Sequence, residues 1–217
     1  MRGLAIILAV AAVSVGCATP PPDGGSTSAS TSVSASASAS KPEAAPATPG
    51  AIDCTQADGE GEKAVCADPE LRALDTRLAE LYQRALSESG SDTATLETEQ
   101  RGWVAGRDDC WKESDVHQCV LEAYQTRLVE LQIKDVDVPA TVEYRCGDNT
   151  TPVSAVFYND IDPSAMVLTV GRDRAILIQQ PTGSGIRYVR EGAEYAEHQG
   201  DIAIDFYGTT LTCTAAE

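Results

Sequence analysis

The sequence is poor in the residues that bind metal ions. Its 217 residues include only two histidines, His117 and His198. Seven cysteines are present, but no two of them form a C-x-x-C pair. Structural zinc sites draw their ligands from closely spaced cysteines and histidines. We therefore expect no metal, and nothing in the sequence calls for another cofactor.

The patterns typical of enzyme active sites are also missing. No Ser-His-Asp arrangement and no glycine-rich phosphate loop stands out. The segment Gly183-Ser184-Gly185 does not match G-x-S-x-G, and no strand-to-helix step surrounds it. We therefore expect a protein that is not an enzyme, with an uncharacterised hydrolase as the remaining catalytic alternative.

Positive charge is scarce. The chain has 16 Lys and Arg residues against 33 Asp and Glu residues, which gives a formal net charge of −17. This balance disfavours nucleic acid and anionic membrane surfaces as partners, and it favours a basic partner through long-range attraction. A role in solubility alone explains the charge equally well.

The N-terminal apolar run, from Leu4 to Val15, is too short to span a bilayer. Because Arg2 precedes it and small residues follow it, the run is typical of a secretory signal over residues 1–16. The segment Ser14-Val15-Gly16-Cys17 resembles a bacterial lipobox, in which the cysteine is lipidated and becomes the new N-terminus. We predict a lipid, such as palmitate, on Cys17; a simple signal peptide with a cysteine near the cut is the alternative.

Residues 17–50 consist of the lipidated cysteine and a Ser-, Ala- and Pro-rich segment with only three charged residues. Such a segment buries too little apolar surface to fold, so we predict a disordered linker between the membrane and the rest of the chain. Ala18 supplies no acidic retention signal after the cysteine. We therefore expect a cell-envelope protein anchored in the outer membrane and facing the periplasm, if the organism has two membranes.

Residues 51–135 show helical periodicity. Asp68-Pro69-Glu70 supplies an N-cap, a first-turn proline and an acidic first turn. Apolar residues then recur at steps of three and four: Leu71, Leu74, Leu78, Leu81 and Ala85. A second helix is expected from about Thr93 to Trp111. A third follows Asp115, whose spacing to Gln118 fits a capping box. Short connections predict a three-helix up-down-up bundle.

The expected bundle brings four cysteines to one end: Cys54, Cys66, Cys110 and Cys119. An exported chain with an even number of remaining cysteines is expected to form disulfides. Three pairings of these four are possible. We favour Cys54–Cys66 with Cys110–Cys119, because each bond closes a short local loop.

From about Thr141 the apolar period changes to two, and Asn, Asp, Gly and Pro separate short β-rich segments. These segments are Val142–Cys146, Val153–Tyr158, Met166–Val170, Ala175–Gln179, Ile186–Val189, Ala193–Glu197, Ile202–Tyr207 and Thr209–Cys213. Eight short strands predict an antiparallel β-barrel over residues 140–217, so the fold class is α+β in two modules. A disulfide between Cys146 and Cys213 would join the first strand to the last.

The helical segment carries a set of motifs between Cys54 and Leu131. They are Cys54, Cys66-Ala67-Asp68-Pro69-Glu70-Leu71, Leu74-Asp75, Leu81-Tyr82, Gln100-Arg101-x-Trp103, Arg107-Asp108-x-Cys110, Cys119 and Tyr124-x-x-Arg127. Together they resemble the LprI-like family of bacterial lysozyme inhibitors. We interpret most of them as core, caps and disulfides, and Arg107, Asp108 and Arg127 as a paired network between helices rather than a contact surface.

The strand-rich segment carries a second set of motifs between Val142 and Cys213. They are Tyr144-x-Cys146, Ala155-Val156-Phe157-Tyr158, Ser184-Gly185-Ile186-Arg187-Tyr188, Gly200-Asp201-x-Ala203 and Cys213. This set resembles the membrane-bound inhibitor of c-type lysozyme family. The resemblance implies that Ser184 enters the enzyme's cleft, with Gly185, Arg187 and Tyr188 around it. Taken alone, Ser184-Gly185 is better interpreted as an ordinary hairpin turn after Pro181, and the resemblance reverses that preference.

The sequence departs from the family at the second contact. There a lysine is expected before a Gly-Asp pair, but Gln199 precedes Gly200-Asp201 and the spacing from Ser184 is one residue longer. Glutamine carries no charge, so its contact is weaker unless Arg187, Arg190 or a protonated His198 compensates. The resemblance implies a lipid-anchored inhibitor of c-type lysozyme. The alternative is an envelope lipoprotein that binds peptidoglycan or an assembly partner.

Overall fold

The computed structural model describes residues 50–147 and 150–216, with the side chain of Ser91 excepted. The predicted signal peptide, the lipidation site at Cys17 and nearly all of the predicted linker lie outside these residues. Within the described residues, the helical segment and the strand-rich segment belong to one compact unit. The two segments are described in turn.

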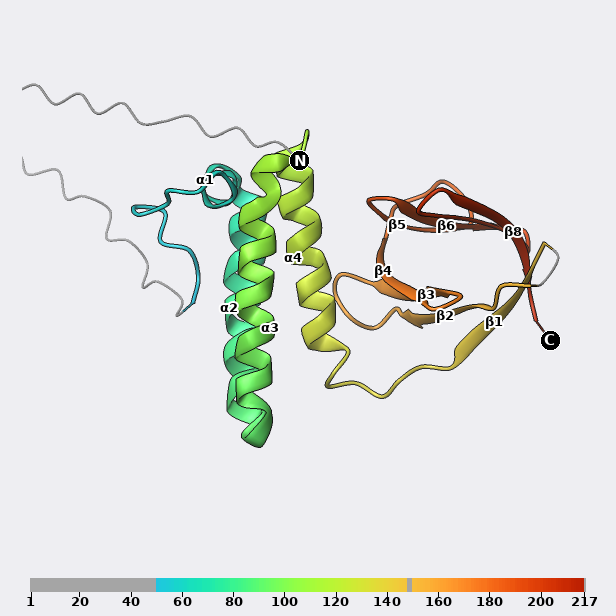
Figure 1. Ribbon diagram of the computed structural model, residues 1–217, viewed down its shortest axis with the longest axis horizontal. Helices are drawn as coiled ribbons and strands as arrows, with labels where there is room; N and C mark the ends of the chain where they lie inside the picture. The colour runs from blue at the N-terminus through green and yellow to red at the C-terminus, as the bar shows by residue number, and fades with distance from the viewer. Residues whose placement is uncertain (1–49, 148–149, 217) are drawn as a thin grey trace, which may run out of the picture. The chain divides into compact units, whose positions relative to one another are not determined.

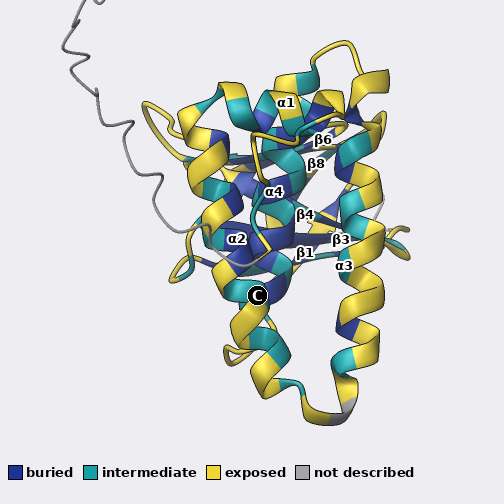
Figure 2. Ribbon diagram, turned by 90° about the vertical axis from the view of Figure 1, so that its left-hand side faces the viewer, coloured by how far each residue is buried: buried dark blue, intermediate teal, exposed yellow. Residues whose placement is uncertain are grey.

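The helical segment has one α-helix more than the sequence predicted. Its helices are α1 (Glu60–Ala67), α2 (Pro69–Glu88), α3 (Thr93–Asp108) and α4 (Val116–Gln132), with two 3-10 turns at Gly90–Asp92 and Asp109–Lys112. α4 packs against both α2 and α3, whereas α2 and α3 overlap in Figure 1 but stand apart in Figure 2. The additional helix, α1, was missed because it is only eight residues long and contains Gly61, which disfavours a helix.

Side-chain caps fix where two of the helices begin. The Asp68 carboxylate accepts hydrogen bonds from the backbone N–H groups of Glu70 (2.7 Å) and Leu71 (3.0 Å) at the start of α2. The Asp115 carboxylate accepts one from Gln118 (2.9 Å) at the start of α4. Each cap satisfies N–H groups that have no partner within the helix. The expected second helix stops at Asp108, and its last residues form a 3-10 turn instead.

The apolar core between the helices encloses a polar cluster. The Tyr124 hydroxyl on α4 donates to Asp75 of α2 (2.8 Å) and accepts from Arg107 of α3 (3.2 Å). The other Asp75 oxygen accepts from the backbone N–H of Ile52 (2.8 Å). Burial, the largest cause, raises the pKa of Tyr124, so the hydroxyl keeps its proton at neutral pH. One tyrosine therefore connects three helices.

The expected network of arginines is divided into two clusters. Arg107 pairs with Asp108 (2.7 Å) and reaches Tyr124. Arg127 pairs with Glu130 on its own helix (2.8 Å). Its Nε donates a hydrogen bond to the side chain of Gln100 on α3 (3.0 Å), and not to Asp108. Both arginines nevertheless bridge α3 and α4, as the interpretation of a network between helices requires.

Replacing Tyr124 with phenylalanine is expected to destabilise the helical segment by about 2–3 kcal/mol, because Asp75 and Arg107 then lose a buried partner. Urea unfolding followed by tryptophan fluorescence measures this loss, since both tryptophans, Trp103 and Trp111, lie in the helical segment. Tyr82→Phe is the matched control, because no hydrogen bond of the Tyr82 hydroxyl is found among the described residues, and it should change the stability little. Equal effects of the two substitutions would contradict the role given to Tyr124.

The six cysteines of the described residues form three disulfides. Cys54 bonds to Cys66, Cys110 bonds to Cys119, and Cys146 bonds to Cys213. The first two are the local pairings that the short loops favour. The Cys54–Cys66 bond holds α1 to the segment before it, which gives this short helix a support that its sequence does not supply.

The strand-rich segment is a closed antiparallel barrel in which each strand pairs with the next and β8 pairs with β1. Its strands are β1 (Thr141–Cys146), β2 (Val153–Tyr158), β3 (Ala165–Val170), β4 (Asp173–Gln179), β5 (Ile186–Arg190), β6 (Ala193–His198), β7 (Asp201–Phe206) and β8 (Thr209–Ala215). These bounds differ from the expected ones by at most two residues. Cys146 lies directly opposite Cys213 where β1 meets β8, so the disulfide crosses the barrel's seam as expected.

Alternating residues fill the barrel's interior. Tyr144, Tyr188 and Tyr195 are buried there, and the hydroxyls of Tyr144 and Tyr195 lie 3.2 Å apart. A separate apolar cluster joins α4 to the outside of the barrel through Val129, Ala165 and Ile178. Interiors packed in this way resist deformation, so the barrel holds the loops at its ends in fixed positions.

Candidate functional site

The loop between β4 and β5, residues 180–185, carries the serine that the sequence analysis singled out. Ser184 is exposed, and so are the residues on either side of it. The Thr182 hydroxyl accepts a hydrogen bond from the Ser184 backbone N–H (3.1 Å) and donates to the Ser184 carbonyl. These bonds hold the backbone of the loop, and the Ser184 hydroxyl has no hydrogen-bond partner among the residues that the structure describes. We call residues 180–185 the Ser184 loop.

Gly185 ties the Ser184 loop closely to the end of β6. Its φ is +73°, in the region that favours glycine. A Cβ atom at this position would stand 2.1 Å from the carbonyl oxygen of Glu197. No side chain fits in that space, so Gly185 lets the loop approach β6 more closely than any other residue would.

The turn between β6 and β7 lies next to the Ser184 loop. Gln199 and Gly200 both have positive φ, +55° and +91°, which is the pattern of a type I′ hairpin turn. The Gly200 N–H donates to the Glu197 carboxylate (2.9 Å). Ile186 at the start of β5 pairs with Glu197 near the end of β6. The structure therefore brings Ser184 and Gln199, both exposed, to the same rim of the barrel.

Tyr188, expected to contact the enzyme, is buried in the core of the barrel. Its side chain is only 1% exposed and points into the barrel, because successive residues of a strand face opposite sides. Its hydroxyl donates to Asn159 (2.8 Å) in the loop after β2. Direct contact between the Tyr188 side chain and an enzyme is incompatible with this burial. The residue instead supports β5, and through it the Ser184 loop, from inside.

Of the three residues expected to offset the missing lysine, Arg187 is exposed but already paired. Its Nε and Nη2 donate to the two carboxylate oxygens of Glu194, each at 2.8 Å. These hydrogen bonds lower the pKa of Glu194. The pair is solvent-exposed, so it contributes little to stability and is free to rearrange on contact with a partner.

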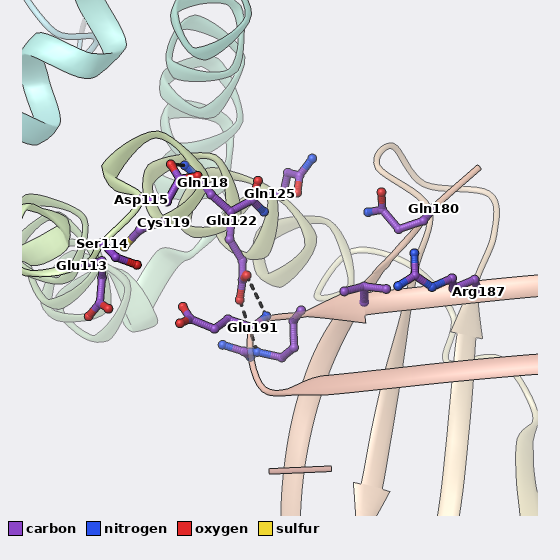
Figure 3. Close-up of a pocket in the computed structure, with 12 residues that line it drawn as sticks. Glu113, Ser114, Asp115, Gln118, Cys119, Glu122, Gln125, Gln180, Arg187 and Glu191 are labelled. Atoms are coloured by element: carbon purple, nitrogen blue, oxygen red, sulfur yellow. Dashed lines mark hydrogen bonds and ion pairs between the residues drawn. The ribbon is translucent and has the colours of Figure 1, made fainter. Parts of the chain in front are cut away.

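Arg190 lies at the opposite end of β5 from Ser184 and is paired with a helix residue. It ends β5, six residues from Ser184, which corresponds to roughly 20 Å along an extended strand. Its Nε lies 3.4 Å from Glu122 of α4. Glu122 also accepts the Glu191 N–H (2.8 Å), beside a cavity of about 340 Å³ between α4 and β5 (Figure 3). His198, the third residue expected to offset the missing lysine, is exposed and lies next to Gly185 of the Ser184 loop.

Sequence reasoning missed three residues that shape the rim: Thr182, Glu197 and Asn159. The sequence contained a signal for Thr182, because a threonine hydroxyl often hydrogen-bonds to the backbone two residues further on in a turn. Glu197 gave no signal of its own, because its hydrogen bond with Gly200 depends on the turn that joins β6 to β7. Asn159 gave no signal, because its link to Tyr188 joins residues 29 positions apart.

The described residues contain no group of three or more His, Cys, Asp or Glu side chains arranged to hold a metal ion. No protein side chain in the described part of the chain hydrogen-bonds to the Ser184 hydroxyl. Within the same residues, no helix has the length and apolar character that a membrane crossing needs. The rim therefore offers a rigid, exposed surface of hydrogen-bonding groups.

Comparisons with known proteins match both segments. The family described as "Lysozyme inhibitor LprI" matches residues 54–131, and the family described as "Membrane-bound lysozyme-inhibitor of c-type lysozyme" matches residues 144–212. "Lipoprotein LprI" of Mycobacterium bovis and of Mycobacterium tuberculosis are each 42% identical to this chain over 171 residues. That alignment covers 78% of this chain and 86% of each relative. No solved structure gives a significant match.

Proposed function

Since this chain belongs to the LprI lipoprotein family, in which a lysozyme-inhibitor helical segment precedes a lysozyme-inhibitor barrel, we propose that it blocks the active-site cleft of a c-type lysozyme with its Ser184 loop. The observation that carries the proposal is the geometry of the rim. An unpartnered hydroxyl stands on a narrow loop that Gly185 and Thr182 hold in place.

Lysozyme needs two carboxyl groups in different protonation states across a cleft, one as the acid and one as an ionised carboxylate. A serine hydroxyl both donates and accepts a hydrogen bond, so it suits such a pair. Gly183 and Gly185 have no side chains, so the loop is narrow on both sides of Ser184. A loop that fills the cleft excludes the glycan strand, and inhibition requires no chemical step.

Charge brings the two proteins together. The inhibitor carries a net charge of −17, and a basic enzyme is attracted to it over long range. At the rim, Gln199 replaces the lysine that the resemblance implies, so the second contact is neutral and weaker. We propose that overall attraction, with His198 beside the Ser184 loop, offsets part of this loss.

The proposal includes a membrane anchor at the N-terminus of the mature chain. A lipid on Cys17 and a linker up to residue 50 hold the inhibitor at the membrane. The linker lets it reach lysozyme that has entered the envelope. The outer membrane facing the periplasm is the proposed location.

A lysis assay tests this function. The mature protein, added in increasing molar ratio, should slow the clearing of a peptidoglycan suspension by c-type lysozyme. Raising the salt concentration from 50 to 300 mM, which shortens the screening length about 2.5-fold, should weaken inhibition, mainly through a slower association rate. An unchanged lysis rate at a large molar excess of the protein would refute the proposal.

A further inference from the structure

A second hollow lies between the helical segment and the barrel. It has a volume of about 770 Å³ and is formed by α3, α4 and the start of β4. Four cationic side chains line it, Arg127, Lys134, Arg174 and Arg190, against two carboxylates, Glu99 and Glu130. We call this hollow the basic groove. An excess of positive charge is unexpected in a chain whose net charge is −17.

The two carboxylates are already engaged. Glu99 pairs with Lys134 (2.8 Å) and lies 3.6 Å from Arg127, and Glu130 pairs with Arg127 (2.8 Å). Arg174 is exposed, and no carboxylate of the described residues pairs with it. The groove's own acids therefore neutralise Lys134 and Arg127. Arg190 is paired with Glu122, which lies outside the groove lining, so the charge of Arg174 remains for a ligand.

Two of the arginines carry buried nitrogen atoms that have no hydrogen-bond partner within residues 50–147 and 150–216. Arg127 is only 3% exposed, and its Nη2 has none, although its Nε and Nη1 are both satisfied. The Nε of Arg190 also has none, because its 3.4 Å approach to Glu122 is an ion pair without hydrogen-bond geometry. A buried donor left unsatisfied costs about 1–3 kcal/mol. Such donors are normally retained where something else satisfies them.

The remaining walls are apolar. Trp103 of α3, Ile133 beyond α4 and Ile176 of β4 line the groove beside the cations. Its volume falls within the range of small-molecule sites, which combine apolar walls with a few placed polar groups. Arginines suit carboxylate and phosphate groups, because a planar guanidinium can donate two hydrogen bonds to one oxyanion.

We propose that the basic groove binds an oxyanion carried by a ligand of small-molecule size with an apolar face. The anion lies between Arg174 and Arg190, and the body of the ligand packs on Trp103 and Ile176. Carboxylated sugar-peptides of the cell wall and phosphorylated metabolites share this chemistry. We expect the site to act independently of lysozyme inhibition, because Arg174 lies near the start of β4 whereas the Ser184 loop follows that strand's other end.

Calorimetric titration of the full mature chain tests the proposal with two probes, muramyl dipeptide as a carboxylate and inorganic phosphate. At least one should bind saturably, and neutral N-acetylglucosamine should not. Arg174→Ala should weaken binding about tenfold, which corresponds to about 1.4 kcal/mol. Arg172→Ala is the matched control, because Arg172 is an exposed arginine two residues away that does not line the groove.

The outcomes separate clearly. Saturable binding of either anion that Arg174→Ala weakens and Arg172→Ala does not supports the site, and the probe that binds identifies the source of the oxyanion. The proposal is overturned if neither anion binds, or if binding is the same in both variants and the parent protein. Lysozyme inhibition should be unchanged in Arg174→Ala, so failure of this site is distinguishable from failure of the proposed function.

Discussion

Replacing Ser184 with glutamate is expected to weaken inhibition of c-type lysozyme by about 100-fold or more. The new carboxylate would face the enzyme's own acidic pair, and opposing like charges in an interface cost several kcal/mol. The side chain also adds bulk to a loop that is proposed to enter a narrow cleft. Because Ser184 is exposed and its hydroxyl has no described protein partner, the barrel should fold normally. The inhibition constant from the lysis assay measures the effect.

A charge control accompanies this variant. Thr210→Glu adds the same charge at an exposed position of β8, away from the Ser184 loop, and leaves the net charge equal to that of Ser184→Glu. It should inhibit about as well as the parent protein. Equal inhibition by the parent and by both variants would show that the Ser184 loop is not the contact.

Removing the disulfide across the barrel's seam is expected to give the largest loss of stability. Cys146 and Cys213 are 67 residues apart in sequence. In the chain-entropy description, a loop of that length corresponds to about 4 kcal/mol of stabilisation. The double substitution to alanine also removes the covalent link between β1 and β8, the pair that closes the sheet. Far-UV circular dichroism in the strand region, recorded during urea unfolding, measures the loss.

The short disulfide in the helical segment provides the comparison. Cys110 and Cys119 are only nine residues apart, which corresponds to about 2.5 kcal/mol by the same description. Tryptophan fluorescence follows this segment separately, because both tryptophans lie in it. A larger loss from opening the nine-residue loop than from opening the 67-residue loop would contradict the role given to the seam.

Local signals in the sequence were sufficient for most of the fold. Asp68 and Asp115 cap the helices that they were expected to begin, and the change of period at Thr141 marks the first strand. The prediction of three helices was wrong because α1 depends on tertiary support. Its residue Val65 is completely buried and the Cys54–Cys66 disulfide holds it, whereas its own composition favours a helix only weakly.

The candidate site was less predictable. The resemblance placed Ser184 and Gln199 in separate motifs, and strand pairing was needed to bring them to one rim. Strand alternation also separates neighbours that the sequence grouped together, since Arg187 faces outwards and Tyr188 lies inside the barrel. The basic groove had no signal at all, because its arginines come from α4, β4 and β5 and meet only in the folded chain.

The most direct measurement is a crystal structure of the mature protein bound to a c-type lysozyme. We expect the Ser184 hydroxyl within hydrogen-bond distance of the enzyme's catalytic carboxyl groups, with Gln199 at the opposite wall of the cleft. A complex in which the Ser184 loop faces solvent while the enzyme's cleft remains open would contradict the account.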